Sequence, residues 1–159
     1  MRQQPSRAEG RREEVSTMRA APSYGHPVGE AAARFQCGAC GDVAAIVRAV
    51  PAGEATDMGT PLRLQAEARD RILLDCFGGT TWKVSEHATY ENVRQILSGQ
   101  APDPADLRRA DWELAPFYCP ECRQNYCRAD WHPDVLFGES HYDCTMATCP
   151  SGHQHVIDD

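Results

Sequence analysis

The middle of the chain alternates apolar and polar residues with the period of β-strands. Residues 62–66 alternate in this way, which places their apolar side chains on one face of a half-buried strand. Residues 71–77 are more continuously apolar and end at two glycines, so residues 80–84 can form the second strand of a hairpin. A short apolar run at 43–47 predicts a further strand, and the Gly, Pro, Asp and Thr residues within 51–61 predict a loop.

After the strand predicted at 80–84, the apolar residues have helical spacing instead of alternation. Val93 and Leu97 are four residues apart, as on one face of a helix. Ser85 or Thr89 can cap the N-terminus of this helix, and Gly99 stands where a helix commonly stops. The pattern therefore predicts one helix of about three turns in this segment.

A second, shorter helix is expected over 103–109, with a proline in its first turn. The fold class is then α+β, with a β-β-β-α-α unit over 51–111 inserted into a single domain over 35–159. Residues 1–34 have little that is large and apolar, which predicts a disordered tail. Regular periodicity is absent over 112–159, where aromatic residues, Cys, His and Pro are frequent, so a bound metal must contribute to order there.

The charge distribution argues against nucleic acid as a partner. The formal net charge is −7. Residues 1–34 carry six Arg and four Glu, whereas residues 35–159 carry ten basic and nineteen acidic residues. Proteins that bind nucleic acid owe much of their affinity to Lys and Arg that neutralise phosphates, and the predicted folded part lacks such an excess.

The cysteines point to metal ligands. No apolar run reaches the length of about 18 residues that a membrane span needs, and the N-terminus lacks the apolar segment of a secretory signal. Its glutamates also argue against an import peptide. We therefore expect a cytoplasmic protein without a membrane partner. Thiols stay reduced in the cytoplasm, so eight cysteines there are expected to bind metal rather than to form disulfides.

Two Cys-x-x-Cys pairs, Cys37/Cys40 and Cys119/Cys122, carry the strongest signal in the sequence. Two intervening residues allow a tight turn to direct both sulfurs at one ion. One such pair alone could be a redox motif, but two pairs separated by a long insertion favour zinc.

Two further donor pairs follow the second Cys-x-x-Cys pair. Cys127 and His132 are five residues apart, and Cys149 and His153 are four apart. Eight donors make two closed tetrahedral sites, the pattern of structural zinc ions. The alternative is a single four-cysteine site with the later donors outside it. The pairs can combine sequentially or as a cross-brace that joins first to third and second to fourth; the closeness of Cys122 to Cys127 slightly favours the cross-brace.

The remaining cysteines and histidines have lesser roles in this interpretation. Cys76 lies within an apolar strand and is expected to be a core thiol. Cys144 could replace a member of the third donor pair, and His141 and His155 are lower-ranked alternatives. Trp131 would pack around the metal, or, if it is exposed, would mark a docking surface, because tryptophan is enriched at interface hot spots.

The C-terminal segment resembles a treble-clef or RING-like zinc module. The resemblance is carried by an aromatic-Cys-Pro-x-Cys step at 117–122, a Tyr-Cys step at 126–127 and a Cys-Pro-x-Gly-His end at 149–153. It is most similar to bacterial proteins with this pattern, and the likeness extends to 37–40 but not to the insertion.

The resemblance implies a function as well as a fold. RING domains are docking platforms for ubiquitin-conjugating enzymes, and relatives occur in bacterial ubiquitin-like operons. By resemblance alone, the apolar docking positions would fall near Ile46, Trp131 and Pro150.

The function that we expect from the sequence is a zinc-stabilised interaction module that binds a protein partner and has no covalent chemistry of its own. Its most specific form is a RING-like adaptor for a ubiquitin-conjugating-type enzyme in a bacterial ubiquitin-like conjugation system. One alternative is a zinc-ribbon protein that binds nucleic acid, which the acidic composition disfavours. Another is a thiol- or zinc-dependent enzyme, which the closed donor count disfavours; no nucleotide-binding loop, HExxH or GxSxG motif occurs.

Overall fold

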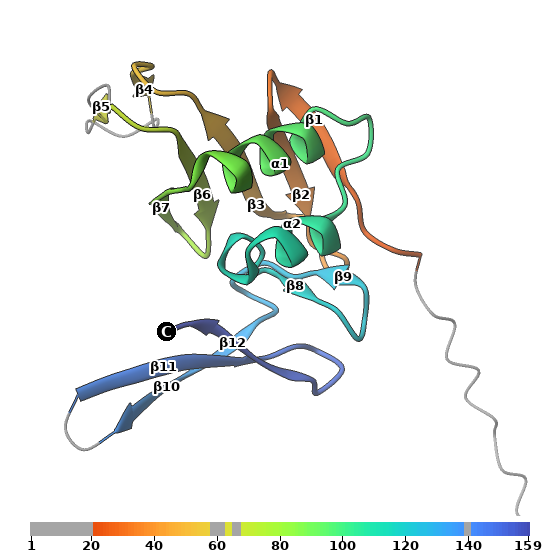
Figure 1. Cartoon of the computed structure of the whole chain (residues 1–159). Coiled ribbons are helices and arrows are strands. Elements are labelled where there is room, and N and C mark those ends of the chain that lie inside the picture. The colour runs from red at the N-terminus through yellow and green to blue at the C-terminus, as the bar shows by residue number, and fades with distance from the viewer. Residues whose placement is uncertain (1–20, 58–62, 65–67, 139–140) are drawn as a thin grey trace, which may run out of the picture.

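A five-stranded antiparallel sheet forms the larger part of the protein, which we describe from a computed structural model of residues 21–57, 63–64, 68–138 and 141–159. The strand order is β1-β2-β3-β6-β7, so that each strand lies beside the one that precedes it in this sheet (Figure 1). The strands are β1 (Gly25–Gly29), β2 (Ala32–Gln36), β3 (Val43–Val50), β6 (Arg71–Cys76) and β7 (Gly79–Val84). A separate two-stranded pair, β4 (Thr56–Asp57) and β5 (Arg63–Leu64), lies in the connection from β3 to β6.

The periodic segments of the sequence form the strands that they predict. The strands expected at 43–47, 71–77 and 80–84 are confirmed as β3, β6 and β7. The strand expected at 62–66 overlaps β5, although its remaining positions lie outside the described residues. The same holds for the end of the predicted loop over 51–61.

The predicted disordered tail is wrong for its last part, because residues 25–29 and 32–34 belong to β1 and β2. The segment has no large apolar side chain before Phe35, and its three consecutive alanines from Ala31 to Ala33 are buried. Backbone pairing with β3 fixes this hairpin, and the Gly25 amide donates to the Pro102 carbonyl at 2.7 Å. The hairpin of β1 and β2 could not be predicted from side-chain hydrophobicity, because backbone hydrogen bonds hold it in place. Residues 1–20 lie outside the described residues.

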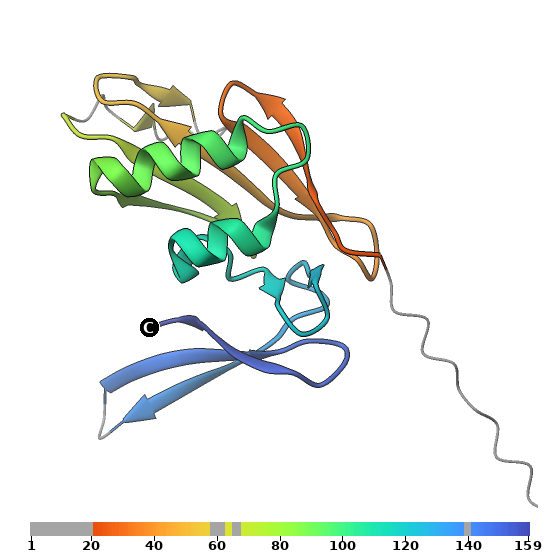
Figure 2. The ribbon, with the colours of Figure 1, turned by 45° about the vertical axis from the view of Figure 1, so that its right-hand side comes forward.

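The core lies between one face of the sheet and two helices. Register places small and branched apolar side chains side by side on this face, with Ala33 opposite Val47 and Val47 opposite Leu74. Helix α1 (His87–Leu97) crosses the same face and buries Tyr90, Val93 and Leu97 (Figures 1 and 2). The structure consists mostly of strands with two α-helices, which agrees with the expected mixed α and β class.

The helix ends follow the sequence only in part. Glu86 occupies the N-cap position of α1 without a side-chain hydrogen bond, so neither Ser85 nor Thr89 caps it as predicted. At the other end, the Ser98 hydroxyl donates to the Arg94 carbonyl at 2.8 Å.

The second helix, α2 (Pro104–Ala110), matches its prediction. Its proline occupies the first helical position, where the missing amide hydrogen costs nothing. The Asp103 carboxylate caps this helix by accepting from the Ala105 amide at 2.8 Å.

The chain after residue 112 contains more regular structure than its pattern predicts. A turn of 3-10 helix, η1 (Trp112–Leu114), leads into the short strands β8 (Tyr118–Cys119) and β9 (Gln124–Asn125). A three-stranded antiparallel sheet then follows, made of β10 (His132–Gly138), β11 (His141–Thr148) and β12 (Gln154–Asp158). Six of the seven β10 residues are exposed, so this strand has no apolar alternation to reveal it. Figure 2 shows this sheet projecting from the larger one.

Two aromatic rings join the larger sheet to the C-terminal segment. Phe35 of β2 and Phe117 before β8 are both fully buried, with ring centroids 5.0 Å apart. Among the described residues, no helix is long and apolar enough to cross a membrane.

We predict that Phe35→Ala lowers the free energy of unfolding by about 3–5 kcal/mol, because it leaves a cavity at this junction. Denaturant unfolding followed by circular dichroism measures the change. The matched control is Val28→Ala on β1, where the side chain is exposed and the expected change is within about 0.5 kcal/mol. Equal losses in the two variants would contradict the importance of the aromatic junction.

Candidate metal centre

The first donor pair lies on a tight turn that directly follows β2. The Gly41 amide donates to the Cys37 carbonyl at 2.9 Å, which closes the turn. Gly41 has a φ of 82°, in the left-handed region that glycine adopts without strain. The Ala39 amide points at the Cys37 sulfur, at 3.4 Å. The turn thus directs two sulfurs to the same side.

The second and third donor pairs use the same turn. The Arg123 amide donates to the Cys119 carbonyl at 2.8 Å, and Arg123 has a φ of 57° where Gly41 stands in the first turn. The Trp131 amide donates to the Cys127 carbonyl at 3.0 Å. Three turns closed in this way therefore present Cys37 and Cys40, Cys119 and Cys122, and Cys127.

The fourth turn connects β11 to β12. The Gly152 amide donates to the Cys149 carbonyl at 2.8 Å, with Gly152 at a φ of 87°. The Cys149 amide donates to the His153 carbonyl at 2.9 Å, and the His153 amide points at the Cys149 sulfur at 3.4 Å.

Within the described part of the chain, two groups of four donors result, and in each group all donor atoms lie within 4.8 Å of one another. The first, which we call site A, consists of Cys37, Cys40, Cys127 and Asp130. Its Cys40 and Cys127 sulfurs are 3.6 Å apart. The Asp130 Oδ2 lies 3.0 Å from the Cys37 sulfur and 3.3 Å from the Cys127 sulfur.

The second group, site B, consists of Cys119, Cys122, Cys149 and His153. The Cys122 and Cys149 sulfurs are 3.6 Å apart. The His153 Nδ1 lies between 3.2 and 3.7 Å from the three sulfurs. Of the donors in site B, the Cys119 and Cys149 residues are almost fully buried.

These distances suit a tetrahedral zinc ion. Zinc–sulfur bonds of about 2.3 Å and zinc–nitrogen bonds of about 2.0 Å place two sulfurs about 3.8 Å apart in a tetrahedron, and a sulfur and a nitrogen about 3.5 Å apart. The spacing in site B agrees with both values. Soft thiolates with one nitrogen or one carboxylate oxygen also form a donor set that zinc accepts.

Asp130 sets the charge of site A. Hydrogen bonds from the Cys37, Cys40 and Cys127 thiols lower the pKa of the Asp130 carboxyl. The Asp42 backbone amide lowers the pKa of the Cys40 thiol, but the Asp130 carboxylate and neighbouring thiols outweigh it and raise that pKa to about 12. The Cys40 thiol therefore keeps its proton beside the carboxylate unless a cation displaces it.

Site B contains one thiol that ionises more readily. Burial raises the pKa of Cys122, but hydrogen bonds from Ser151, Tyr126 and neighbouring thiols outweigh burial and lower the pKa to about 7. Burial raises the pKa of Cys119 in the same site. One thiolate is thus available near neutral pH to begin metal binding.

Seven of the eight donors expected from the sequence lie in sites A and B. The exception is His132, which is exposed at the start of β10 opposite Thr148 and belongs to neither donor group. Asp130 stands in its place. The first donor pair meets Cys127 of the third, and the second pair meets the fourth, as in the cross-brace and not in the sequential arrangement.

Sequence reasoning missed Asp130, although a signal was present. Cys127 and Asp130 are separated by two residues, the same spacing as in both Cys-x-x-Cys pairs. A turn of that length presents its first and fourth side chains together, whereas the five-residue step to His132 does not.

The alternative donors lie apart, with one exception. Neither Cys144 and His141 of β11 nor Cys76 of β6 belongs to a donor group among the described residues. His155 lies beside site B, with its Nε2 atom 3.5 Å from the Cys119 sulfur and 2.8 Å from a Glu121 carboxylate oxygen. Burial lowers the pKa of His155, although Glu121 acts in the opposite direction.

The expected docking residues do not form one exposed surface. Trp131 is only 2% exposed and packs edge-on against Tyr126 with ring centroids 5.6 Å apart, so its predicted role as a docking anchor is wrong. Ile46 is half-buried in β3, and Pro150 is exposed in the turn between β11 and β12.

The fold and the donor groups together define a small mixed α and β protein with two cysteine-rich clusters that could hold metal ions. A family model described as a domain of unknown function (DUF8328) matches residues 27–159, and the chain belongs to this family. Neither the search of curated proteins nor that of solved structures found a match.

We predict that Asp130 and His132 respond differently to removal. Asp130→Ala should lower the zinc content from two ions per chain to one, because site A loses its fourth donor. His132→Ala, the matched control two residues away, should keep both ions. Native mass spectrometry of the full chain measures the content. Loss of an ion from the His132 variant alone would return the fourth ligand to His132.

Cys76 should behave as a packing residue without metal. Burial raises the pKa of its thiol to about 12, with a smaller effect of Asp75 in the same direction. Cys76→Ser should therefore keep both ions and lower the free energy of unfolding by about 1–3 kcal/mol, the cost of a poorly paired buried hydroxyl. Metal analysis and denaturant unfolding test the two parts. A variant that loses zinc would assign Cys76 a role in metal binding.

Proposed function

We propose that sites A and B each hold one structural zinc ion, and that the part of the chain they fix is a protein-interaction module. Each site supplies four donors, which closes the coordination sphere and leaves no position for a substrate. Metal binding displaces protons from the thiols and stabilises the fold around them. Such ions organise a surface and carry out no chemistry on a bound molecule.

The observation that carries this proposal is the position of the β10–β11 hairpin. Asp130 of site A lies just before β10 begins, and Cys149 of site B lies just after β11 ends. Both strands of the hairpin are therefore fixed at their base by a donor group. A metal in each site would hold the hairpin at a defined angle to the larger sheet, since neither end could pivot alone.

Among the described residues, the exposed large apolar side chains of the C-terminal segment all lie on the hairpin. Phe137 is 72% exposed, and the exposed side chains around it are Val135, Leu136 and Tyr142. Apolar side chains clustered on a projecting element are typical of a protein-binding surface. We propose Phe137 as the docking anchor, in the role that the sequence suggested for Trp131. Aromatic side chains contribute disproportionately to binding energy at interfaces.

The partner that we propose is a ubiquitin-conjugating-type enzyme, with the protein acting as a RING-like adaptor of a bacterial ubiquitin-like conjugation system. The interleaved use of donor pairs supports a cross-braced, RING-like arrangement. An adaptor of this kind accelerates transfer by holding a charged carrier in a reactive geometry. This requires a rigid surface and no catalytic side chain.

Two rival functions have less support. The excess of nine acidic residues over 35–159 opposes phosphate binding, which weakens the case for nucleic acid. A thiol enzyme would need a nucleophile with a lowered pKa, whereas the pKa of Cys76 is raised to about 12.

The proposal predicts that the zinc-loaded protein accelerates discharge of a charged ubiquitin-conjugating-type enzyme to a free amine. Phe137→Ala should reduce this acceleration at least tenfold, since about 1.4 kcal/mol of lost contact suffices for that factor. Thioester discharge is followed on non-reducing gels. Zinc content and melting temperature of the variant should remain unchanged, because Phe137 is exposed.

The matched control is Val28→Thr, which removes an exposed apolar side chain on β1, an edge strand of the larger sheet that does not include the hairpin. This variant should retain full acceleration, and chelation of zinc should abolish it in every variant. Absence of acceleration together with tight binding of duplex DNA at physiological salt would replace the adaptor with the zinc-ribbon alternative.

A further inference from the structure

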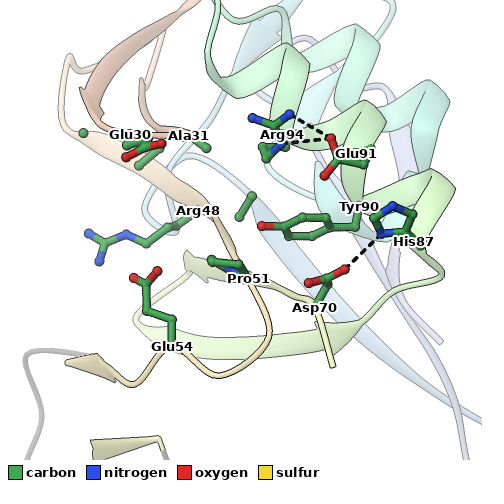
Figure 3. Close-up of a pocket in the computed structure, with 13 residues that line it drawn as sticks. Glu30, Ala31, Arg48, Pro51, Glu54, Asp70, His87, Tyr90, Glu91 and Arg94 are labelled. Atoms are coloured by element: carbon green, nitrogen blue, oxygen red, sulfur yellow. Dashed lines mark hydrogen bonds and ion pairs between the residues drawn. The ribbon is translucent and has the colours of Figure 1, made fainter. Parts of the chain in front are cut away.

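A second candidate site lies at the opposite end of the strands from site A. Site A follows the end of β2, whereas a pocket of about 550 Å³ lies where β2 begins and β3 ends. The connection from β1 to β2 forms one wall and the start of α1 forms another. Figure 3 shows this pocket, in which side chains from separate parts of the chain meet.

Tyr90 is the central side chain of this pocket. The residue is only 3% exposed, and Figure 3 shows it reaching from α1 into the pocket between Arg48 and Asp70. No described residue makes a hydrogen bond to its hydroxyl group. The hydroxyl oxygen is not among the fully buried polar atoms without a partner, so the small exposed part of this residue includes the hydroxyl, which faces the pocket. A ligand in the pocket can therefore reach the hydroxyl, while the ring of Tyr90 stays packed in the core.

The pocket carries a net negative charge. Four carboxylates and two guanidinium groups line it, which gives −2 with His87 neutral. Arg94 is already neutralised, because two of its nitrogens donate to the same Glu91 oxygen at 3.0 and 2.8 Å. Asp70 accepts from the Ala52 amide at 3.0 Å and lies 3.2 Å from the His87 ring.

Two other carboxylates remain uncommitted. Within the described part of the chain, the carboxylates of Glu30 and Glu54 take part in no ion pair or hydrogen bond. Glu54, Asp70 and Glu91 all act on the Tyr90 hydroxyl and, with burial as the largest cause, raise its pKa. Carboxylates from three parts of the chain therefore surround one neutral hydroxyl.

We propose that this pocket binds the ammonium group of a linear aliphatic amine. The Tyr90 hydroxyl would accept a hydrogen bond from the ammonium group, and the uncommitted carboxylates would neutralise its charge. The alanine and proline side chains of the wall, Ala31, Ala32, Ala49 and Pro51, would contact the methylene groups of the ligand. The same chemistry is offered by a free diamine and by a lysine side chain of a peptide.

The test is calorimetric titration of the zinc-loaded full chain with 1,4-diaminobutane at physiological salt. We expect saturable binding of the diamine and no binding of 1,4-butanediol, which has the same length without charge. N-acetyl-lysine methylamide distinguishes the two sources. Equal or tighter binding of this capped lysine identifies a peptide side chain as the ligand, and preference for the diamine identifies a free amine.

Three variants locate the binding. Tyr90→Phe keeps the buried ring and removes only the hydroxyl, so diamine affinity should fall about tenfold or more, as for a hydrogen bond to a charged group. Glu54→Gln should weaken affinity similarly. The control Asp134→Asn removes an exposed charge of β10, outside the pocket, and should leave affinity unchanged. Circular dichroism and zinc content verify that each variant is folded.

The proposal is overturned if the diamine fails to bind at millimolar concentration. It is also overturned if the diol binds as well as the diamine, or if Tyr90→Phe and Glu54→Gln bind the diamine like the unaltered chain. The outcome is independent of the adaptor function, because the pocket and the β10–β11 hairpin share no residue.

Discussion

The structure depends on the meeting of donor pairs that are far apart in the sequence. Cys40 and Cys127 are 87 residues apart, yet their sulfurs are 3.6 Å from each other. The intervening chain contains most of the larger sheet and both helices. The first turn is additionally tied to β9, since the Gly38 amide donates to the Asn125 carbonyl at 2.8 Å. The sheet and the C-terminal segment therefore have a common junction, and the orientation of each fixes that of the other.

The sequence predicted those parts of the fold that rest on apolar side chains. The strands β3, β6 and β7 and both helices carry the period that their burial requires, so their positions could be deduced. The hairpin of β1 and β2 could not, because its buried residues are mainly alanines and the segment is held by backbone pairing. The strand β10 was missed for the opposite reason: its side chains face solvent, and only its pairing with β11 defines it.

The donor set shows a similar division. Both Cys-x-x-Cys pairs are visible because cysteines are rare and closely spaced. An aspartate is one of many acidic residues, so Asp130 is distinguished only by the turn that carries it. The pairing of donors in the two sites depends on the path of the chain between them. That path cannot be deduced from the spacing of residues within each pair. Trp131 likewise could not be assigned to core or surface until its packing against Tyr126 was known.

The junction between the larger sheet and the C-terminal segment constrains how the protein sequence can vary. The chain leaves the first donor turn after Gly41 and returns at Phe117, whose ring meets that of Phe35. The unit between these points therefore begins and ends at neighbouring places, as an inserted domain does. Lengthening or shortening its outer loops would leave all eight donors where they are. Natural variants of the chain can thus diverge at the Tyr90 pocket while they retain an unaltered C-terminal module.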